Sequence, residues 1–175
     1  MTKLTADRMK AEIACYWRYA KQCSLVALEA TFPWLGTADV LAVDRRGFLI
    51  ETEVKLNVAD LRQDKRKQKH LDFARGSRNS PLAYFYFAVP RELANHVGLL
   101  CDNLYPYAGV LGSDCDDLPG RSVRIYRTAR LISQQKPSLL QLARIAKQQS
   151  GALCRLAIKV AESGNHGLKG DQTGV

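Results

Sequence analysis

Apolar positions repeat in two different ways along this chain, and the repeats predict its elements. Between Thr5 and about Lys21, apolar residues recur every third or fourth position, which predicts a helix with one buried face and Thr5 as its cap. The apolar positions of this helix are Met9, Ile13, Tyr16, Trp17 and Ala20. Residues 24–30, 37–43 and 49–55 are short and rich in aliphatic side chains, which predicts three strands.

Turn and cap residues separate these segments. Asp44–Gly47 predicts a turn between the second and third strands. Asn57 predicts the start of a helix with Asp60 in its first turn. Residues 82–89 are apolar and aromatic almost throughout and end at Pro90, which predicts a central strand buried on both faces. The order helix, three strands, helix, strand predicts a single α/β domain around a mixed sheet.

The last part of the chain gives shorter signals. Three further strand candidates follow: residues 98–101, 108–111 and an edge strand at 123–127. Pro137 predicts the opening of a C-terminal helix, with an interruption weighed at residues 150–151. Residues 163–175 contain almost no apolar side chain. We therefore expect one domain over residues 1–162, followed by a disordered tail.

The charge of the chain indicates what kind of partner it binds. The chain has 175 residues, of which 46% are apolar and 25% charged, as expected of a soluble globular protein. Its 26 Lys and Arg against 17 Asp and Glu give a net charge of +9, which favours a polyanionic partner such as nucleic acid. From Arg121 to Val160 there are nine Lys or Arg and no Asp or Glu. This stretch is either a surface for the flanks of a duplex or ordinary solubilising charge.

The cysteines and the ends of the chain indicate a compartment. The five cysteines are odd in number, scattered and without a Cys-x-x-Cys pair, which is typical of reduced thiols in a cytosolic protein. The N-terminal residues lack the apolar core of a signal peptide. No apolar run approaches the roughly 20 residues that span a bilayer. We expect a cytoplasmic protein without a membrane partner.

The main candidate for chemistry lies on the second and third predicted strands. Side chains two positions apart share a face of a strand, so Glu53 and Lys55 project side by side, and Asp39 reaches them if the two strands pair. Carboxylates suit a hard cation such as Mg²⁺ or Mn²⁺, with the Val54 carbonyl as a further ligand. Lys55 would orient the attacking water or offset charge on the phosphorus. The alternative is a solvated Glu-x-Lys pair on an exposed strand.

A second candidate is the segment from Arg62 to His70, which contains no apolar side chain in nine residues. A helix this polar stands clear of the core or turns two sides to solvent and a ligand. Arg62, Lys65 and Lys69 have helical spacing suited to phosphate contacts, and His70 could contact a phosphate or donate a proton to the leaving oxygen. The alternative is a solvated, charged helix.

These residues carry a family resemblance. Asp39, followed after a strand, turn and strand by Glu53-Val54-Lys55, resembles the signature of the PD-(D/E)xK nuclease superfamily, with Ala38 in place of its proline. The continuation is similar to an MmcB-like branch that includes bacterial DNA-repair-associated and phage-encoded members. It consists of residues 58–64, Lys67, Lys69, His70 and residues 84–90. The similarity covers roughly residues 28–131.

The resemblance implies a fold and a set of roles. The fold is a restriction-endonuclease-like core, a mixed sheet flanked by helices in αβββαβ order. Asp39 and Glu53 would bind the metal with Val54, and Lys55 would be the catalytic lysine. A downstream motif would hold the helix against the site or contact DNA; it comprises Asp64, Lys67, Lys69 and His70.

The additional acidic residue that many members carry has two candidates. Glu29 lies ten positions before Asp39, and Glu12 in the first helix competes with it. Glu51 shares a face with Glu53 and would be a salt-bridge partner or an accessory ligand. The aromatic residues that MmcB-like sequences often have near Lys67 and His70 are absent here, which leaves the geometry of the substrate open.

The function expected from these residues is a Mg²⁺- or Mn²⁺-dependent deoxyribonuclease, an endonuclease rather than an exonuclease, in DNA repair, phage DNA processing or defence. Two alternatives stay open. One is a nucleic-acid-binding module that kept the fold without cutting. The other is a subunit that acts only within a DNA-processing complex, as a homodimer or with a partner protein.

Overall fold

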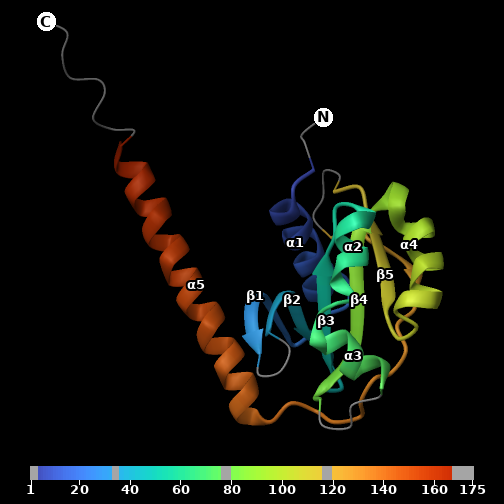
Figure 1. Ribbon diagram of the computed structural model, residues 1–175. Helices are drawn as coiled ribbons and strands as arrows, with labels where there is room; N and C mark the ends of the chain where they lie inside the picture. The colour runs from blue at the N-terminus through green and yellow to red at the C-terminus, as the bar shows by residue number, and fades with distance from the viewer. Residues whose placement is uncertain (1–3, 33–35, 76–79, 116–119, 167–175) are drawn as a thin grey trace, which may run out of the picture.

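The computed structural model describes residues 4–32, 36–75, 80–115 and 120–166. These residues form one sheet with helices on both faces (Figure 1). The helices are α1 (Ala6–Cys15), a π-helical turn η1 (Tyr16–Ala20) that continues it, α2 (Val58–Asp64), α3 (Gln68–Ala74), α4 (Arg91–Leu104) and α5 (Leu139–His166). The strands are β1 (Leu25–Phe32), β2 (Gly36–Val43), β3 (Leu49–Val54), β4 (Leu82–Pro90), β5 (Gly109–Ser113) and β6 (Arg124–Arg127).

The six strands lie in the sheet in their chain order, β1-β2-β3-β4-β5-β6. The first three form an antiparallel meander. β4 is parallel to β3 and β5 is parallel to β4, while β6 pairs antiparallel with β5 at the edge. Parallel neighbours need a crossover, which α2 and α3 supply before β4 and α4 supplies before β5. The α/β class with a mixed sheet, predicted from the apolar pattern, is confirmed.

Two apolar cores lie on the two faces of the sheet. One packs α2, α3 and α4 against residues that include Phe85 and Phe87 of β4. The other packs α1 and η1 against the opposite face, where the ring of Trp17 lies 5.5 Å from that of Tyr86. Alternate residues of β4 therefore enter both cores. This confirms the prediction that residues 82–89 form a central strand buried on both faces.

Several local predictions are confirmed by hydrogen bonds. Thr5 caps α1, and Asn57 caps α2 by accepting from the backbone N–H three positions on, at 2.9 Å. Between β2 and β3, Asp44 accepts two backbone N–H bonds of the turn, and Gly47 adopts a φ of 87° that favours glycine. The strand candidate at residues 108–111 corresponds to β5, and the edge strand at 123–127 corresponds to β6.

The strand prediction for residues 98–101 is wrong, since these residues lie within α4. The apolar residues that decide the structure here are spaced as in a helix. Ala94, Val97 and Cys101 bury one face of α4 against the sheet, whereas Leu99 is 69% exposed. A short run of apolar residues has the same composition whether it crosses a helix or a strand, so the local run alone was misleading.

The polar segment from Arg62 to His70 is not one helix. α2 ends at Asp64 and α3 begins at Gln68, and Lys67 between them has an extended backbone (φ −69°, ψ 133°). Leu61 in α2 and Phe73 in α3 anchor the two short helices to the core, although the segment between them carries no apolar side chain. The break changes which side chains of this segment face inward.

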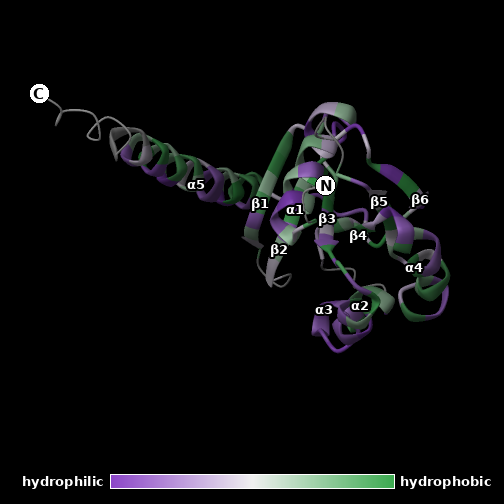
Figure 2. Cartoon of the chain, turned by 90° about the horizontal axis from the view of Figure 1, so that it is seen from above, coloured by the Kyte–Doolittle hydropathy of each residue, from purple (hydrophilic) through white to green (hydrophobic). Residues whose placement is uncertain are grey.

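The C-terminal helix is longer than predicted. α5 runs without interruption through Ser150 and Gly151 and continues to His166, so residues 163–166 are helical rather than part of a tail. The rest of the predicted tail, residues 167–175, lies outside the described residues. α5 starts beside β1, where Ile145 is fully buried, and then extends away from the sheet (Figures 1 and 2).

Two further observations bear on the surroundings of the protein. Among the described residues, no helix is long and apolar enough to cross a membrane. All five cysteines are free thiols, with Cys154 exposed and Cys23, Cys101 and Cys115 buried.

Candidate functional site

Three acidic residues lie in a row across the antiparallel part of the sheet. The register of β1 and β2 pairs Leu28 with Val40 and Ala30 with Ala38, and Glu29 and Asp39 lie between these two pairs. Extending the register of β2 and β3 by one position places Asp39 opposite Glu53. Glu29 has a φ of 48°, which is rare outside glycine and marks an irregular position in β1. The row therefore lies where the regular pairing of β1, β2 and β3 is interrupted.

Asp39 is held from two sides. Its Oδ2 accepts a hydrogen bond of 2.8 Å from the backbone N–H of Val54, which fixes the carboxylate next to Glu53 in the chain. Its Oδ1 lies 3.5 Å from the Lys10 ammonium of α1, and that ammonium also donates to Glu29 at 2.8 Å. The hydrogen bond with Glu29 raises the pKa of Lys10, and the same bond lowers the pKa of Glu29. Lys10 therefore keeps its positive charge beside two carboxylates.

Glu53 lies beneath a group of three lysines. Its Oε2 is 3.2 Å from the Lys55 ammonium and 3.3 Å from that of Lys67, while its Oε1 accepts from Lys69. Burial would raise the pKa of this carboxyl, but the three neighbouring ammonium groups outweigh burial and lower it. Glu53 is therefore an ionised carboxylate held in a largely buried position.

Lys55 bridges two carboxylates. Its ammonium donates to Asp64 at 2.8 Å as well as to Glu53. Burial alone would lower the pKa of Lys55, but the hydrogen bond with Asp64 and the charge of Glu53 outweigh burial and raise it. Lys55 is therefore a protonated donor. In this state it can stabilise negative charge but cannot accept a proton.

A series of buried, hydrogen-bonded side chains holds the carboxylate that binds Lys55. Asp64 lies 3.0 Å from Nε2 of His70, and Nδ1 of His70 lies 2.6 Å from the Tyr107 hydroxyl. Burial lowers the pKa of His70 in spite of the charge of Asp64, so the ring is neutral. A neutral ring satisfies both bonds if Nε2–H donates to Asp64 and the Tyr107 hydroxyl donates to Nδ1. These hydrogen bonds fix the Asp64 carboxylate, which in turn binds the Lys55 ammonium.

Glu51 forms the innermost part of the cluster. It is fully buried, and its Oε1 accepts from Lys69 at 2.6 Å. Its Oε2 has no hydrogen-bond partner among the described residues. Burial raises the pKa of Glu51 to about 7, with the charge of Lys69 acting in the opposite direction. Lys69 therefore serves both Glu51 and Glu53 inside the protein.

The structure brings together most of the residues that the sequence singles out, but not all in the expected places. Lys69 and His70 are buried, whereas Arg62 and Lys65 are exposed. Of the two candidates for an additional acidic residue, Glu29 shares the row with Asp39. The other, Glu12, is hydrogen-bonded to Ser113 and Ser122.

Two members of the cluster were missed in the sequence, Lys10 and Tyr107. Neither lies near the motif in sequence, so no local signal could find them.

The same geometry limits what the site could bind. Among the described residues, no group of three or more His, Cys, Asp or Glu side chains is arranged to hold a metal ion. The acidic donors closest to the expected pattern are Asp39 and Glu53, with the Val54 carbonyl in the same strand segment. A cation here would depend on two carboxylates and water rather than on a closed protein cage.

Comparisons with known proteins give evidence about the fold alone. Neither the protein-family models nor the curated proteins contain a match to this chain. Among solved structures, the chain is similar to a protein of unknown function from Silicibacter pomeroyi, with a TM-score of 0.59 and 17% identity. The match covers 97% of this chain and 99% of that one. At such low identity the likeness shows that the two chains share an overall fold.

Proposed function

We propose that this protein is a metal-dependent nuclease that hydrolyses DNA phosphodiester bonds, with Asp39, Glu53 and Lys55 at its centre. The observation that carries the proposal is that Asp39 accepts a hydrogen bond of 2.8 Å from the backbone N–H of Val54, next to Glu53, with the protonated Lys55 ammonium 3.2 Å from the Glu53 carboxylate. The order of one helix, three strands, helices and a parallel fourth strand agrees with the restriction-endonuclease-like core that the sequence resemblance implies.

The proposed centre needs Mg²⁺ or Mn²⁺, and its donors fit such an ion. Asp39, Glu53 and the Val54 carbonyl offer only oxygen ligands, and Mg²⁺ keeps several waters, so it needs few protein ligands. Three ammonium groups around Glu53 show that this carboxylate is already balanced by positive charge. The Lys67 side chain is 46% exposed, so it can leave most easily when a cation arrives. A bound ion would polarise the scissile phosphate and lower the pKa of the attacking water.

The residues of the chain have separate tasks in this proposal. Lys55 offsets the charge that develops on the phosphate, because its ammonium stays protonated and is aimed by Asp64. His70, which is itself hydrogen-bonded to Tyr107, holds Asp64, and we assign neither of them a contact with the substrate. Lys10 holds Asp39 on the opposite side. Lys55 is therefore the only one of these groups that we assign to charge stabilisation.

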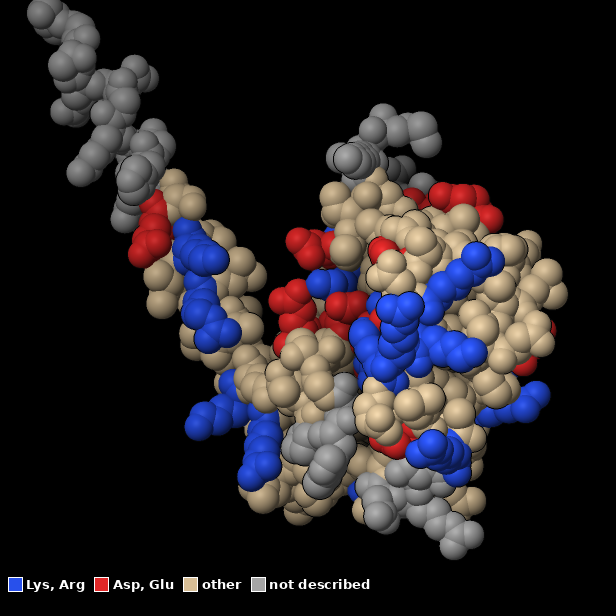
Figure 3. Space-filling view, in the orientation of Figure 1, with Lys and Arg blue, Asp and Glu red and all other residues tan. Residues whose placement is uncertain are grey.

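Exposed basic side chains beside the centre suit the phosphates of a DNA substrate. Figure 3 shows Lys and Arg side chains gathered over α2 and the start of α3, next to a group of acidic side chains. The exposed members are Arg62, Lys65, Arg66 and Lys67. Contacts of this kind hold the backbone and read no sequence, which agrees with an enzyme that selects DNA by form.

One observation favours a second function, a nucleic-acid-binding module that does not cut. Both oxygens of Glu53 are engaged by lysines. A site that stays filled by ammonium groups would bind phosphate through its lysines and leave no place for a metal ion. The two functions differ in whether Lys67 and Lys69 give way to a cation.

Cleavage of labelled DNA separates these functions. Circular duplex, linear duplex, branched and single-stranded DNA would be incubated with Mg²⁺ or Mn²⁺ and the wild type, Glu53→Ala or Lys55→Ala. We expect cutting by the wild type that stops when the metal is chelated, and loss of cutting in both variants. Cutting of the circular DNA would assign an endonuclease. Binding without cutting under every condition would leave the binding module as the function.

A further inference from the structure

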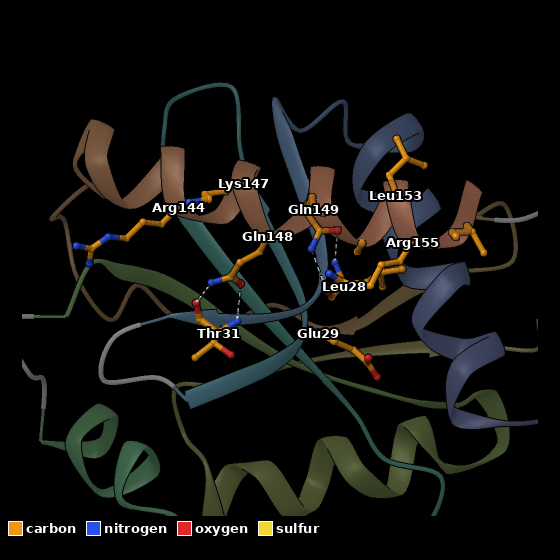
Figure 4. A pocket seen from close by; sticks show the side chains of 12 residues that line it. Leu28, Glu29, Thr31, Arg144, Lys147, Gln148, Gln149, Leu153 and Arg155 are labelled. Atoms are coloured by element: carbon orange, nitrogen blue, oxygen red, sulfur yellow. Dashed lines mark hydrogen bonds between the residues drawn. The ribbon is translucent and has the colours of Figure 1, made fainter. Parts of the chain in front are cut away.

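Helix α5 forms a fixed arm beside the sheet. Its 28 residues span about 42 Å at 1.5 Å per residue. Two adjacent side chains attach it to the edge strand: Gln148 exchanges two hydrogen bonds with the backbone of Thr31, at 3.0 and 3.1 Å, and Gln149 does so with Leu28. The amides pair with β1 as another strand would (Figure 4). The direction of the helix is therefore set by the body of the protein.

A groove of about 910 Å³ lies between α5 and β1. Its floor on the β1 side includes Leu28, Glu29 and Thr31. Glu29 belongs to the acidic row of the candidate site and shares the Lys10 ammonium with Asp39. The groove therefore opens beside the proposed catalytic centre.

The charged residues that α5 contributes to this groove are all basic. They are Arg144, Lys147 and Arg155, and they line it together with apolar residues of α5 that include Leu153 and Leu156. Among the described residues that line the groove, the one acidic side chain is Glu29 of β1, which is paired with Lys10. Arg144, Arg155 and Lys159 are separated by 11 and 4 positions, which places them on one side of the helix. They span 15 positions, or about 22 Å along the helix axis. This length corresponds to roughly six base pairs of duplex DNA.

Two exposed apolar residues of α5, Leu153 and Val160, lie on the side away from the arginines, and Leu156 lines the groove. In Figure 4, Arg155 extends toward β1 and Arg144 extends from the helix to one side, whereas Leu153 points away from the strand. Leu153 and Val160 are both largely exposed. A flat bilayer could reach these apolar residues only from outside, on the side away from the arginines, so the basic wall is poorly placed for lipid headgroups.

We propose that duplex DNA lies along the basic side of α5, across the mouth of this groove, so that the arm holds the phosphate backbone that leads to the catalytic centre. The choice of DNA as the partner rests on the proposed function. Duplex rather than single-stranded DNA is favoured because, among the described residues, none that lines the groove is an aromatic residue on which unpaired bases could stack. The arm and the basic residues of α2 and α3 then contact the substrate on two sides of the acidic row.

The test is a binding measurement in the presence of a chelator, so that no cleavage occurs. A labelled duplex of about 20 base pairs, longer than the arm, is titrated with the wild type and with the triple variant Arg144→Ala, Arg155→Ala and Lys159→Ala. A matched control removes three exposed charges outside the basic stretch of residues 121–160: Lys21→Ala, Arg45→Ala and Arg46→Ala. We expect the arm variant to bind the duplex about ten-fold or more weakly than the wild type does. The dependence of its affinity on salt concentration should be smaller, by the amount that about three phosphate contacts contribute. The control should stay within about two-fold of the wild type.

Three results would overturn the proposal. Equal affinities of the arm variant and the wild type would mean that α5 does not contact DNA. An equal or larger loss with a single strand of the same length would contradict the duplex assignment. Binding of the protein to vesicles of phosphatidylcholine and phosphatidylserine, lost in the arm variant while DNA affinity is kept, would make α5 a membrane-surface helix.

The failure of this proposal can be told apart from the failure of the proposed function. If the arm binds duplex but no metal supports cutting, the proposed function fails alone. If the protein cuts but the arm variant binds like the wild type, only the arm proposal fails.

Discussion

At the scale of single residues, the charge of each group in the candidate site is set by its neighbours. Glu53 is ionised because three ammonium groups surround it, and His70 is neutral because it is buried. The sequence could predict that Asp39, Glu53 and Lys55 come together, because strand alternation and one turn determine it. It could not predict the contacts of Lys10 or Tyr107, which are made by residues distant in the chain.

Lys69 offers a test of the buried cluster. Lys69→Ala would leave Glu51 and Glu53 buried with one cation fewer, so we expect a loss of about 3–5 kcal/mol in the free energy of unfolding. The measurement is urea denaturation. Lys65→Ala, at an exposed lysine four positions earlier, is the control and should change stability by less than about 0.5 kcal/mol. A loss of similar size in both variants would show that Lys69 is not buried between the carboxylates.

The cysteines provide a second test at this scale. Burial raises the pKa of Cys23 to about 11 and that of Cys101 to about 12, so both remain thiols at pH 8 in the folded protein. We expect a disulfide reagent to label Cys154 quickly and these two only on unfolding. Cys154→Ser should remove the fast phase. Because a raised thiol pKa favours the neutral form in the folded state, stability should also fall as pH rises above about 9. Fast labelling of Cys23 or Cys101 in the folded protein would contradict their burial.

At the scale of elements, the sequence was informative wherever the pattern extended over several turns or a whole strand. The first helix, the three-strand meander and β4 follow from periodicity, caps and turn residues. α4 was missed because its apolar residues at 98–101 form a short continuous run, and α2 and α3 were merged because a polar segment gives no sign of where a helix stops. In both cases tertiary packing decided the structure.

Substitutions at two glycines test these elements, and their expected effects on stability are opposite. Gly98 lies in α4 with no atom within 4 Å of an added Cβ, so Gly98→Ala should stabilise the protein by about 0.5–1 kcal/mol, as expected inside a helix. Gly109 opens β5 against the ring of Tyr86 and the backbone of Ala129. Gly109→Ala must displace both of them and should cost about 1–3 kcal/mol. Thermal unfolding measures both. Destabilisation by Gly98→Ala would argue against α4, and a neutral Gly109→Ala would argue against the close packing of β5.

At the scale of the whole molecule, the candidate site depends on how distant segments of the chain meet. Glu29, Asp39 and Glu53 lie on three neighbouring strands of the sheet, and α5 returns from the end of the chain to cover the edge of β1. The sequence predicted the strands and a basic C-terminal region. It could not place that region beside the acidic row, because nothing in a local pattern fixes the direction of a helix that follows an eleven-residue connection, residues 128–138.

Single-turnover cleavage of a labelled duplex with Mn²⁺ tests the claim that Glu53 belongs to a centre that cuts DNA. The comparison is between Glu53→Gln and Glu12→Gln, since Glu12 is also a buried carboxyl but is bonded to Ser122 at 2.7 Å. We predict that Glu53→Gln slows cleavage on the order of 100-fold or more, because even groups that only support a metal ligand change activity by about 10–100-fold. Glu12→Gln should cut at close to the wild-type rate. Equal cleavage rates for the wild type and Glu53→Gln would contradict the claim.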